Sequence, residues 1–168
     1  MLSTLLAVVC LGAATALQTT IAIQMPLLRG PVDLVLLTMI AWCLRPRLPG
    51  AYIWGAVAGL LVGFVSEQPG WLTLASYGSA ALLAAALPRR VWDVPLLNLF
   101  AAVLVGSVLV HAATYGYIAI LQTTVSLQDA LNLVLLPSLV LNFLLALPIY
   151  GLMGEFAKLF YPVEVANE

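Results

Sequence analysis

The side chains best suited to chemistry in this sequence are one carboxylate and one small set of polar groups, all set in apolar runs. Asp33 is the carboxylate, and it stands at the start of the short apolar run from Val32 to Leu44. His111 shares a predicted helix face with Ser107 and Tyr115 at four-residue spacing, which would suit a polar pocket or a proton path. A lone histidine in such a place also suits a hydrogen bond to a neighbouring helix or to the membrane interface, which is the simpler interpretation.

Enzyme chemistry needs groups that converge, such as a nucleophile with a base, two carboxylates or a cluster of metal ligands. The sequence has no His-Glu-x-x-His motif, no Gly-x-Ser-x-Gly elbow and no P-loop, and it offers Asp33 no second carboxylate within an apolar run. Cys10 and Cys43 lack the paired spacing of a metal site and read as small apolar side chains. We therefore expect no catalytic residue, no cofactor and no metal.

Asp33 has two interpretations. Gly30 and Pro31 precede it, so it falls in the first turn of a predicted helix, where a carboxylate binds free backbone N–H groups and complements the helix dipole. The alternative is a specific contact with a partner protein. Asn98 and Asn142 are likewise interpreted as interhelical hydrogen-bonding groups rather than as substrate ligands.

The composition is that of a membrane protein. Of the 168 residues, 64% are hydrophobic and 8% are charged, and the mean hydropathy is +1.12; soluble domains carry charge on roughly a quarter of their residues. The net charge of −1 provides no basic surface for nucleic acid. The sequence therefore predicts an all-α, polytopic membrane protein.

Prolines, glycines and charges divide the chain into about six apolar runs, which we interpret as a single transmembrane domain over residues 1–168. A bilayer core about 30 Å thick needs about 20 apolar residues in a helix, so the second run is marginal and is expected to be tilted or only partly embedded. A short cytoplasmic tail, 154–168, follows the last run. The predicted spans are 2–23, 31–44, 51–65, 71–87, 95–121 and 130–153, the last of them capped by Ser126-Leu127-Gln128-Asp129.

The first run also resembles a secretory signal that ends at Ala14-Thr15-Ala16, but no Lys or Arg precedes it, which favours a retained helix. Six spans with both termini in the cytoplasm follow the positive-inside rule. This orientation leaves Arg29, Glu67 and Asp129 outside. The cytoplasmic basic residues are then Arg45, Arg47, Arg89, Arg90 and Lys158.

One predicted helix carries a stripe of small residues at strict four-residue spacing. The stripe consists of Ala51, Gly55, Gly59 and Gly63, and it allows another helix to approach closely. The simpler interpretation is an internal contact with the preceding or following helix. The functional one is a groove for the transmembrane helix of a partner.

Several motifs of the first half resemble the bacterial rod shape-determining protein MreD family. They are Gly30-Pro31-Val32-Asp33-Leu34, Gly55-x-x-x-Gly59-Leu60-Leu61 and Gln68-Pro69-Gly70-Trp71-Leu72. The resemblance covers most of residues 1–90, whereas the last two helices match in hydropathy alone. The chain departs from the family at Val32, where proline is usual, and at Gly63, where the family has an acidic residue whose role is therefore not carried over.

The resemblance implies a non-enzymatic scaffold of the elongasome in the bacterial cell inner membrane. Such a protein binds MreC and helps to couple MreB filaments to the glycosyltransferase RodA and its class B transpeptidase, which build lateral-wall peptidoglycan and maintain cell shape. A partner with one helix and a periplasmic domain would dock at the outer ends, around 29–33 and 67–71.

The family is also similar in fold to the substrate-binding subunits of energy-coupling-factor transporters. The alternative function is therefore a membrane subunit that binds a small molecule such as a vitamin. A vitamin cavity needs several polar groups at one depth. The polar groups available in this chain are expected to lie at different depths in the membrane. They are Ser107, His111, Tyr115, Ser138 and Asn142.

Overall fold

The described part of the chain folds into six helices. The computed structural model describes residues 2–24, 32–45, 48, 50–87, 94–121 and 126–161, and this part of the chain is all-α, as the sequence predicts. The helices are α1 (Leu2–Gln24), α2 (Leu34–Cys43), α3 (Ala51–Val65), α4 (Gly70–Ala86), α5 (Pro95–Leu121) and a last helix made of three consecutive segments, α6 (Leu127–Asp129), η2 (Ala130–Leu135) and α7 (Leu136–Phe160).

Local sequence signals mark the starts of four helices. Gly50, which precedes α3, has a φ of +94°, a conformation that suits glycine because it lacks a Cβ atom. Pro69 precedes α4 in an extended conformation, and Pro95 is the first residue of α5. Ser126 caps the last helix as predicted, because its Oγ accepts the backbone N–H of Asp129.

The last helix differs from the prediction at both ends. It begins at Leu127, three residues before the predicted start, and includes a π-helical stretch over Ala130–Leu135. It continues to Phe160, although the sequence predicted an end at Met153 and a tail from residue 154. Met153, Gly154 and Ala157 are buried, so packing against the rest of the protein keeps this segment helical despite its lower hydropathy.

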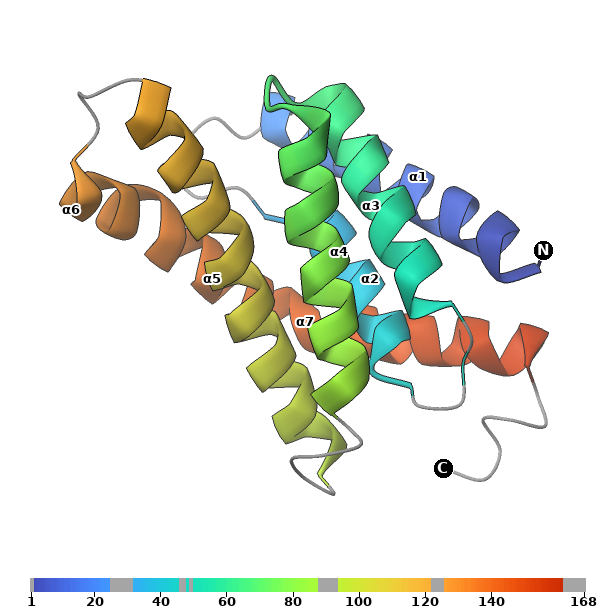
Figure 1. Cartoon of the computed structure of the whole chain (residues 1–168). Helices are drawn as coiled ribbons and strands as arrows, with labels where there is room; N and C mark the ends of the chain where they lie inside the picture. The colour runs from blue at the N-terminus through green and yellow to red at the C-terminus, as the bar shows by residue number, and fades with distance from the viewer. Residues whose placement is uncertain are drawn as a thin grey trace.

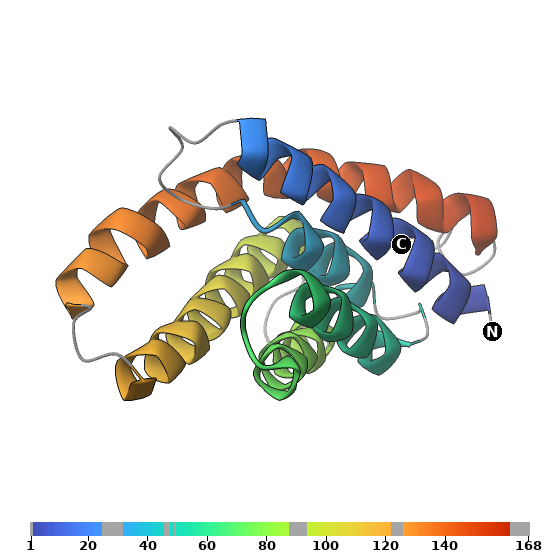
Figure 2. The same cartoon turned by 90° about the horizontal axis from the view of Figure 1, so that it is seen from above.

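Helix α2 lies at the centre of the molecule. Every residue from Val35 to Cys43 is buried, although α2 has only ten residues. Figure 2 shows α1 and α7 on one side of α2 and α3, α4 and α5 on the other, and α2 contacts all five. In Figure 1 the tightly packed hairpin of α3 and α4 stands in front of α2, while α6 and η2 project away from α1.

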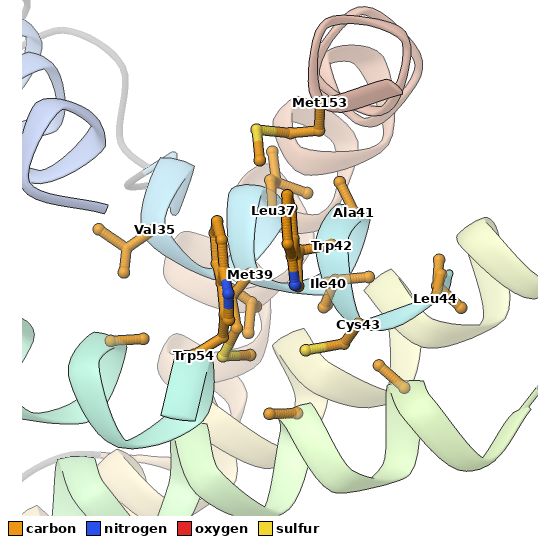
Figure 3. Packing of buried hydrophobic residues seen from close by; sticks show 14 of the residues in the cluster. Val35, Leu37, Met39, Ile40, Ala41, Trp42, Cys43, Leu44, Trp54 and Met153 are labelled. Atoms are coloured by element: carbon orange, nitrogen blue, oxygen red, sulfur yellow. The ribbon is translucent and has the colours of Figure 1, made fainter. Parts of the chain in front are cut away.

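Two stacked tryptophans occupy the end of the core near the C-terminus of α2 (Figure 3). The rings of Trp42 and Trp54 lie 4.4 Å apart and nearly parallel. Tyr161 packs edge-on against Trp42 from the end of α7, with 6.0 Å between ring centroids. The indole nitrogen of Trp54 donates to Oγ of Ser3, which ties the start of α1 to the same cluster.

Three helices are long and apolar enough to cross a membrane: Leu2–Thr20 within α1, Pro95–Leu121 and Leu127–Phe160. These three support a multi-pass membrane protein. The other three are apolar but shorter, with α2, at about 1.5 Å per residue, only about 15 Å long. The last helix, with 34 residues, is about 50 Å long and exceeds the thickness of a bilayer core.

Candidate functional site: a buried polar cluster at the start of α2

Asp33 caps the N-terminus of α2. Its Oδ1 accepts the backbone N–H of Leu36 at 2.9 Å, which is the capping geometry expected of a carboxylate at this position. Only 6% of the residue is exposed. The carboxylate also lies at the positive end of the helix dipole, which stabilises a negative charge. The structure thus gives Asp33 the capping geometry of the first interpretation.

Two distant side chains complete the environment of Asp33. The hydroxyl of Tyr77 in α4 donates to Oδ2 at 2.5 Å. The backbone N–H of Asp33 donates to Oδ1 of Asn142 in α7 at 3.0 Å. Both contacts are buried, where an unsatisfied polar group is costly. Asp33 therefore connects the start of α2 to α4 and α7, which lie far from it in the sequence.

The cluster continues from Asn142 into α5. The amide nitrogen Nδ2 of Asn142 donates to Oγ of Ser107 at 3.1 Å, and both residues are fully buried. Nδ1 of His111 lies 2.7 Å from the carbonyl oxygen of Ser107, so this nitrogen carries the proton, because a carbonyl only accepts. We call Asp33, Tyr77, Asn142, Ser107 and His111 the polar cluster.

The polar cluster brings together two of the groups that were expected to be spread in depth. Ser107 and Asn142 are hydrogen-bonded to each other. Ser138 is also fully buried, and His111 and Tyr115 are half-buried further along the same face of α5. Sequence spacing places residues along one helix, but it does not place two helices relative to each other, so this contact was not predicted.

A cation lies at the opposite end of α2. Arg45 follows the C-terminus of the helix and is buried, with its guanidinium 4.8 Å from the ring of Tyr150 and Nη2 donating to the Tyr150 carbonyl at 3.3 Å. Gly154 provides the space for this guanidinium, because a Cβ there would lie 2.7 Å from Nη2. Opposite charges at the two ends of α2 both complement its dipole.

The glycine stripe of α3 packs against α4. A Cβ atom at Gly55 would lie 2.7 Å from Cβ of Ala81, and one at Gly59 would lie 2.6 Å from Cα of Leu74. At Gly63 it would lie 2.7 Å from Oγ1 of Thr73. The contact made by these three glycines is therefore internal to the chain, and this face of α3 is occupied.

The other predicted positions fall into two groups. Asn98 is buried in α5, Cys43 is buried at the end of α2 and Cys10 is partly buried in α1. Three of the basic residues that support the predicted orientation, Arg47, Arg89 and Arg90, lie outside the described residues. So does Arg29, the one basic residue that this orientation places outside.

Sequence reasoning missed two members of these sites. Tyr77 was not singled out, because a tyrosine in an apolar helix carries no signal of its partner; its position on the face of α4 that also carries Ser76 and Thr73 is the only local hint. Arg45 was assigned to a basic turn, and nothing in its neighbourhood indicated that it would be buried against α7.

The chemistry available to the polar cluster is hydrogen bonding. Both carboxylate oxygens of Asp33 already accept a hydrogen bond, and both ends of the Asn142 amide are engaged. Within the described ranges, no group of three or more His, Cys, Asp or Glu residues is placed to hold a metal ion. The cluster thus links α2, α4, α5 and α7 to one another.

Comparisons with protein-family models, with curated proteins and with solved structures find no match to this chain.

Proposed function

We propose that this chain is a non-enzymatic scaffold of the bacterial inner membrane that holds components of the elongasome together. In this proposal it binds MreC and helps to couple MreB filaments to RodA and its class B transpeptidase, and so to lateral-wall peptidoglycan synthesis. It crosses the membrane about six times with both termini in the cytoplasm. The MreD-like motifs of the first half motivate the choice of partners.

The observation that carries the proposal is that the polar groups at the centre of the fold bond to one another. Asp33, Tyr77, Asn142 and Ser107 form one connected set of hydrogen bonds. A subunit that binds a vitamin would instead direct such groups into a cavity to orient its ligand. Because these side chains bond to one another, they favour a protein that binds its partners through its outer surface.

The surface open to partners is apolar and lies on the outsides of the helices. Large apolar side chains are exposed along α1, α5 and the last helix, including Val9, Ile120 and Leu144. Because Asp33 and the glycines of α3 are engaged internally, we no longer assign them to the partner interface. Between helices already in lipid, binding depends on close packing and a few polar contacts.

Trp71 is the docking position in this proposal, at the predicted outer end. It is 66% exposed at the start of α4, and its ring packs edge-on against Tyr117 of α5. An exposed aromatic ring that packs on a neighbouring helix is the kind of anchor that interfaces use. Tyr52 offers a matched control, because it is 70% exposed at the start of α3, near the opposite end of the same hairpin.

Purification from a rod-shaped bacterial host in mild detergent tests the proposal. We expect the tagged chain to recover an MreC-like protein in a fixed ratio, and we expect depletion of the chain to round the cells. Trp71→Ala should reduce recovery of the partner, whereas Tyr52→Ala should not. Recovery of a pair of ATPases instead, with tight binding of a vitamin by the isolated chain, would replace this proposal with the transporter subunit.

A further inference from the structure

The last helix divides into a part that packs on the protein and a part that does not. Residues 127–136 include no buried residue, whereas burial begins at Ser138 and Leu139 and continues through Asn142 to Ala157. Among the described helices, α6 comes within 8 Å of none outside its own, measured between Cα atoms, and η2 comes that close only to α5. We call residues 127–136 the arm.

The backbone is irregular where the arm ends. The N–H of Leu136 donates to the carbonyl of Leu131, five residues back, rather than four as in an α-helix. Pro137 explains this wider turn, because in an α-helix its ring would collide with the carbonyl of Leu133. Proline also lacks an N–H, so this turn has one hydrogen bond fewer than a regular helix. The backbone is therefore weakened between the arm and the packed part.

The last helix also bends at this place. Figure 2 shows it changing direction where η2 meets α7. Sharp bends in helices arise at prolines and at π-helical turns, and both are present here. Pro148 lies inside α7 as well, but between buried Ala146 and Met153, so packing on both sides holds the helix in place there. Pro137, in contrast, is followed by a packed segment and preceded by an unpacked one.

The arm lies beside the second half of α5. Burial in α5 ends at Ser107, and residues 108–121 are half-buried or exposed. His111 of the polar cluster lies in this half and is itself half-buried. Because η2 approaches α5 and no other described helix, a change of the bend at Pro137 alters the contacts of the arm with α5 alone.

We propose that the arm is a hinged element, which bends at the π-helical turn before Pro137 and so opens and closes against residues 108–121 of α5. The packed part of the last helix stays in place while the arm moves, because Asn142 is bonded to Asp33 and Ser107. Closure covers the His111 side of the polar cluster, and opening exposes it. This motion is independent of the scaffold function proposed above.

Double electron–electron resonance between two spin labels, on the full chain in lipid nanodiscs, tests the hinge. In a Cys10→Ala background, with Cys43 buried, one label replaces exposed Leu82 of α4. The other replaces either Gln128 of the arm or Leu159 of the packed part, both exposed and both near an end of the last helix, so that fraying affects them alike. Distances from position 128 should be broadly distributed or fall into two groups, whereas those from position 159 should form one narrow peak.

Two proline variants assign the motion to the hinge. Pro137→Ala supplies the N–H and removes the ring, so the arm should continue α7 and the distances from position 128 should narrow to one peak. Pro148→Ala makes the same chemical change in the packed part and should leave both distributions as they are. An unchanged distance from position 159 shows that a variant is folded, and Pro137→Leu replaces Pro137→Ala if the latter is not.

Two results would overturn the assignment. The first is a wild-type distribution from position 128 that is as narrow as the one from position 159, which would show that the arm is fixed. The second is an equal effect of the two proline variants on the distances from position 128, which would show that any motion of the arm does not arise at Pro137.

Discussion

Oδ1 of Asn142 lies 3.0 Å from the backbone nitrogen of Asp33, a residue 109 positions earlier in the chain. The nitrogen of the same amide donates to Ser107. One side chain of α7 thus satisfies buried groups at the start of α2 and within α5, and this bridge gives the first of four predictions.

Replacing Asn142 with alanine should lower the free energy of unfolding by about 1 to 3 kcal/mol, because the N–H of Asp33 would stay buried without its acceptor. Asn132→Ala is the control, since Asn132 is exposed in η2 of the same helix and should change stability little. Denaturant unfolding in detergent micelles, followed by circular dichroism, measures both. Equal losses in the two variants would contradict the bridge.

Tyr77→Phe removes the hydroxyl that donates to Asp33 and keeps the ring, so it should cost about 1 to 3 kcal/mol of stability. Combined with Asp33→Asn, the two losses should not add, with a coupling energy of about 0.5 to 3 kcal/mol, as for residues in direct contact. Tyr52→Phe, at an exposed tyrosine, is the control. If the two losses of stability simply add in this double-mutant cycle, the contact between Tyr77 and Asp33 is ruled out.

Gly59→Ala and Gly116→Ala should change stability in opposite directions. A Cβ atom at Gly59 would meet the backbone of Leu74 at 2.6 Å, which forces α3 and α4 apart and should cost about 1 to 3 kcal/mol. At Gly116 nothing lies within 4 Å, so alanine should stabilise α5 by about 0.5 to 1 kcal/mol through its higher helix propensity. Thermal unfolding of both variants measures the difference. If Gly59→Ala is the more stable of the two, the α3 to α4 contact is looser than described.

The proposed orientation predicts opposite labelling at the two ends of the last helix. Gln128 and Lys158 are both exposed, near opposite ends of Leu127–Phe160. In a Cys10→Ala background, with Cys43 buried, a cysteine at position 128 should react with an impermeant thiol reagent in intact cells. One at position 158 should react only after lysis. The reverse pattern would invert the proposed topology.

The helices could be predicted because their ends are encoded locally. Two helices start at or after a proline, Pro69 or Pro95, and the last helix is capped by Ser126. Such residues act on the backbone next to them, independently of the rest of the chain. The C-terminal end of α7 was misjudged for the opposite reason, since its helical state depends on the burial of Gly154 and Ala157 against other segments.

For the polar cluster, the sequence predicted the roles of single residues but not the contacts between them. The capping role of Asp33 follows from the residues beside it, but its bonds to Tyr77 and Asn142 span 44 and 109 positions. No periodicity within a single helix carries that information. The same holds for Arg45, whose contact with Tyr150 spans 105 positions.

Two of the hydrogen bonds at the ends of α2, to Asn142 and to Tyr150, come from the last helix of the chain. During synthesis from the N-terminus, α2 enters the membrane region long before either bond exists, as a segment too short to cross on its own. Its start and its end then lack the contacts that they have in the finished protein. The contacts of α2 are therefore complete only once α7 has been made. A chain truncated before residue 142 would keep its other apolar segments but lack both of these hydrogen bonds, and we expect it to be removed by quality-control proteolysis in the membrane.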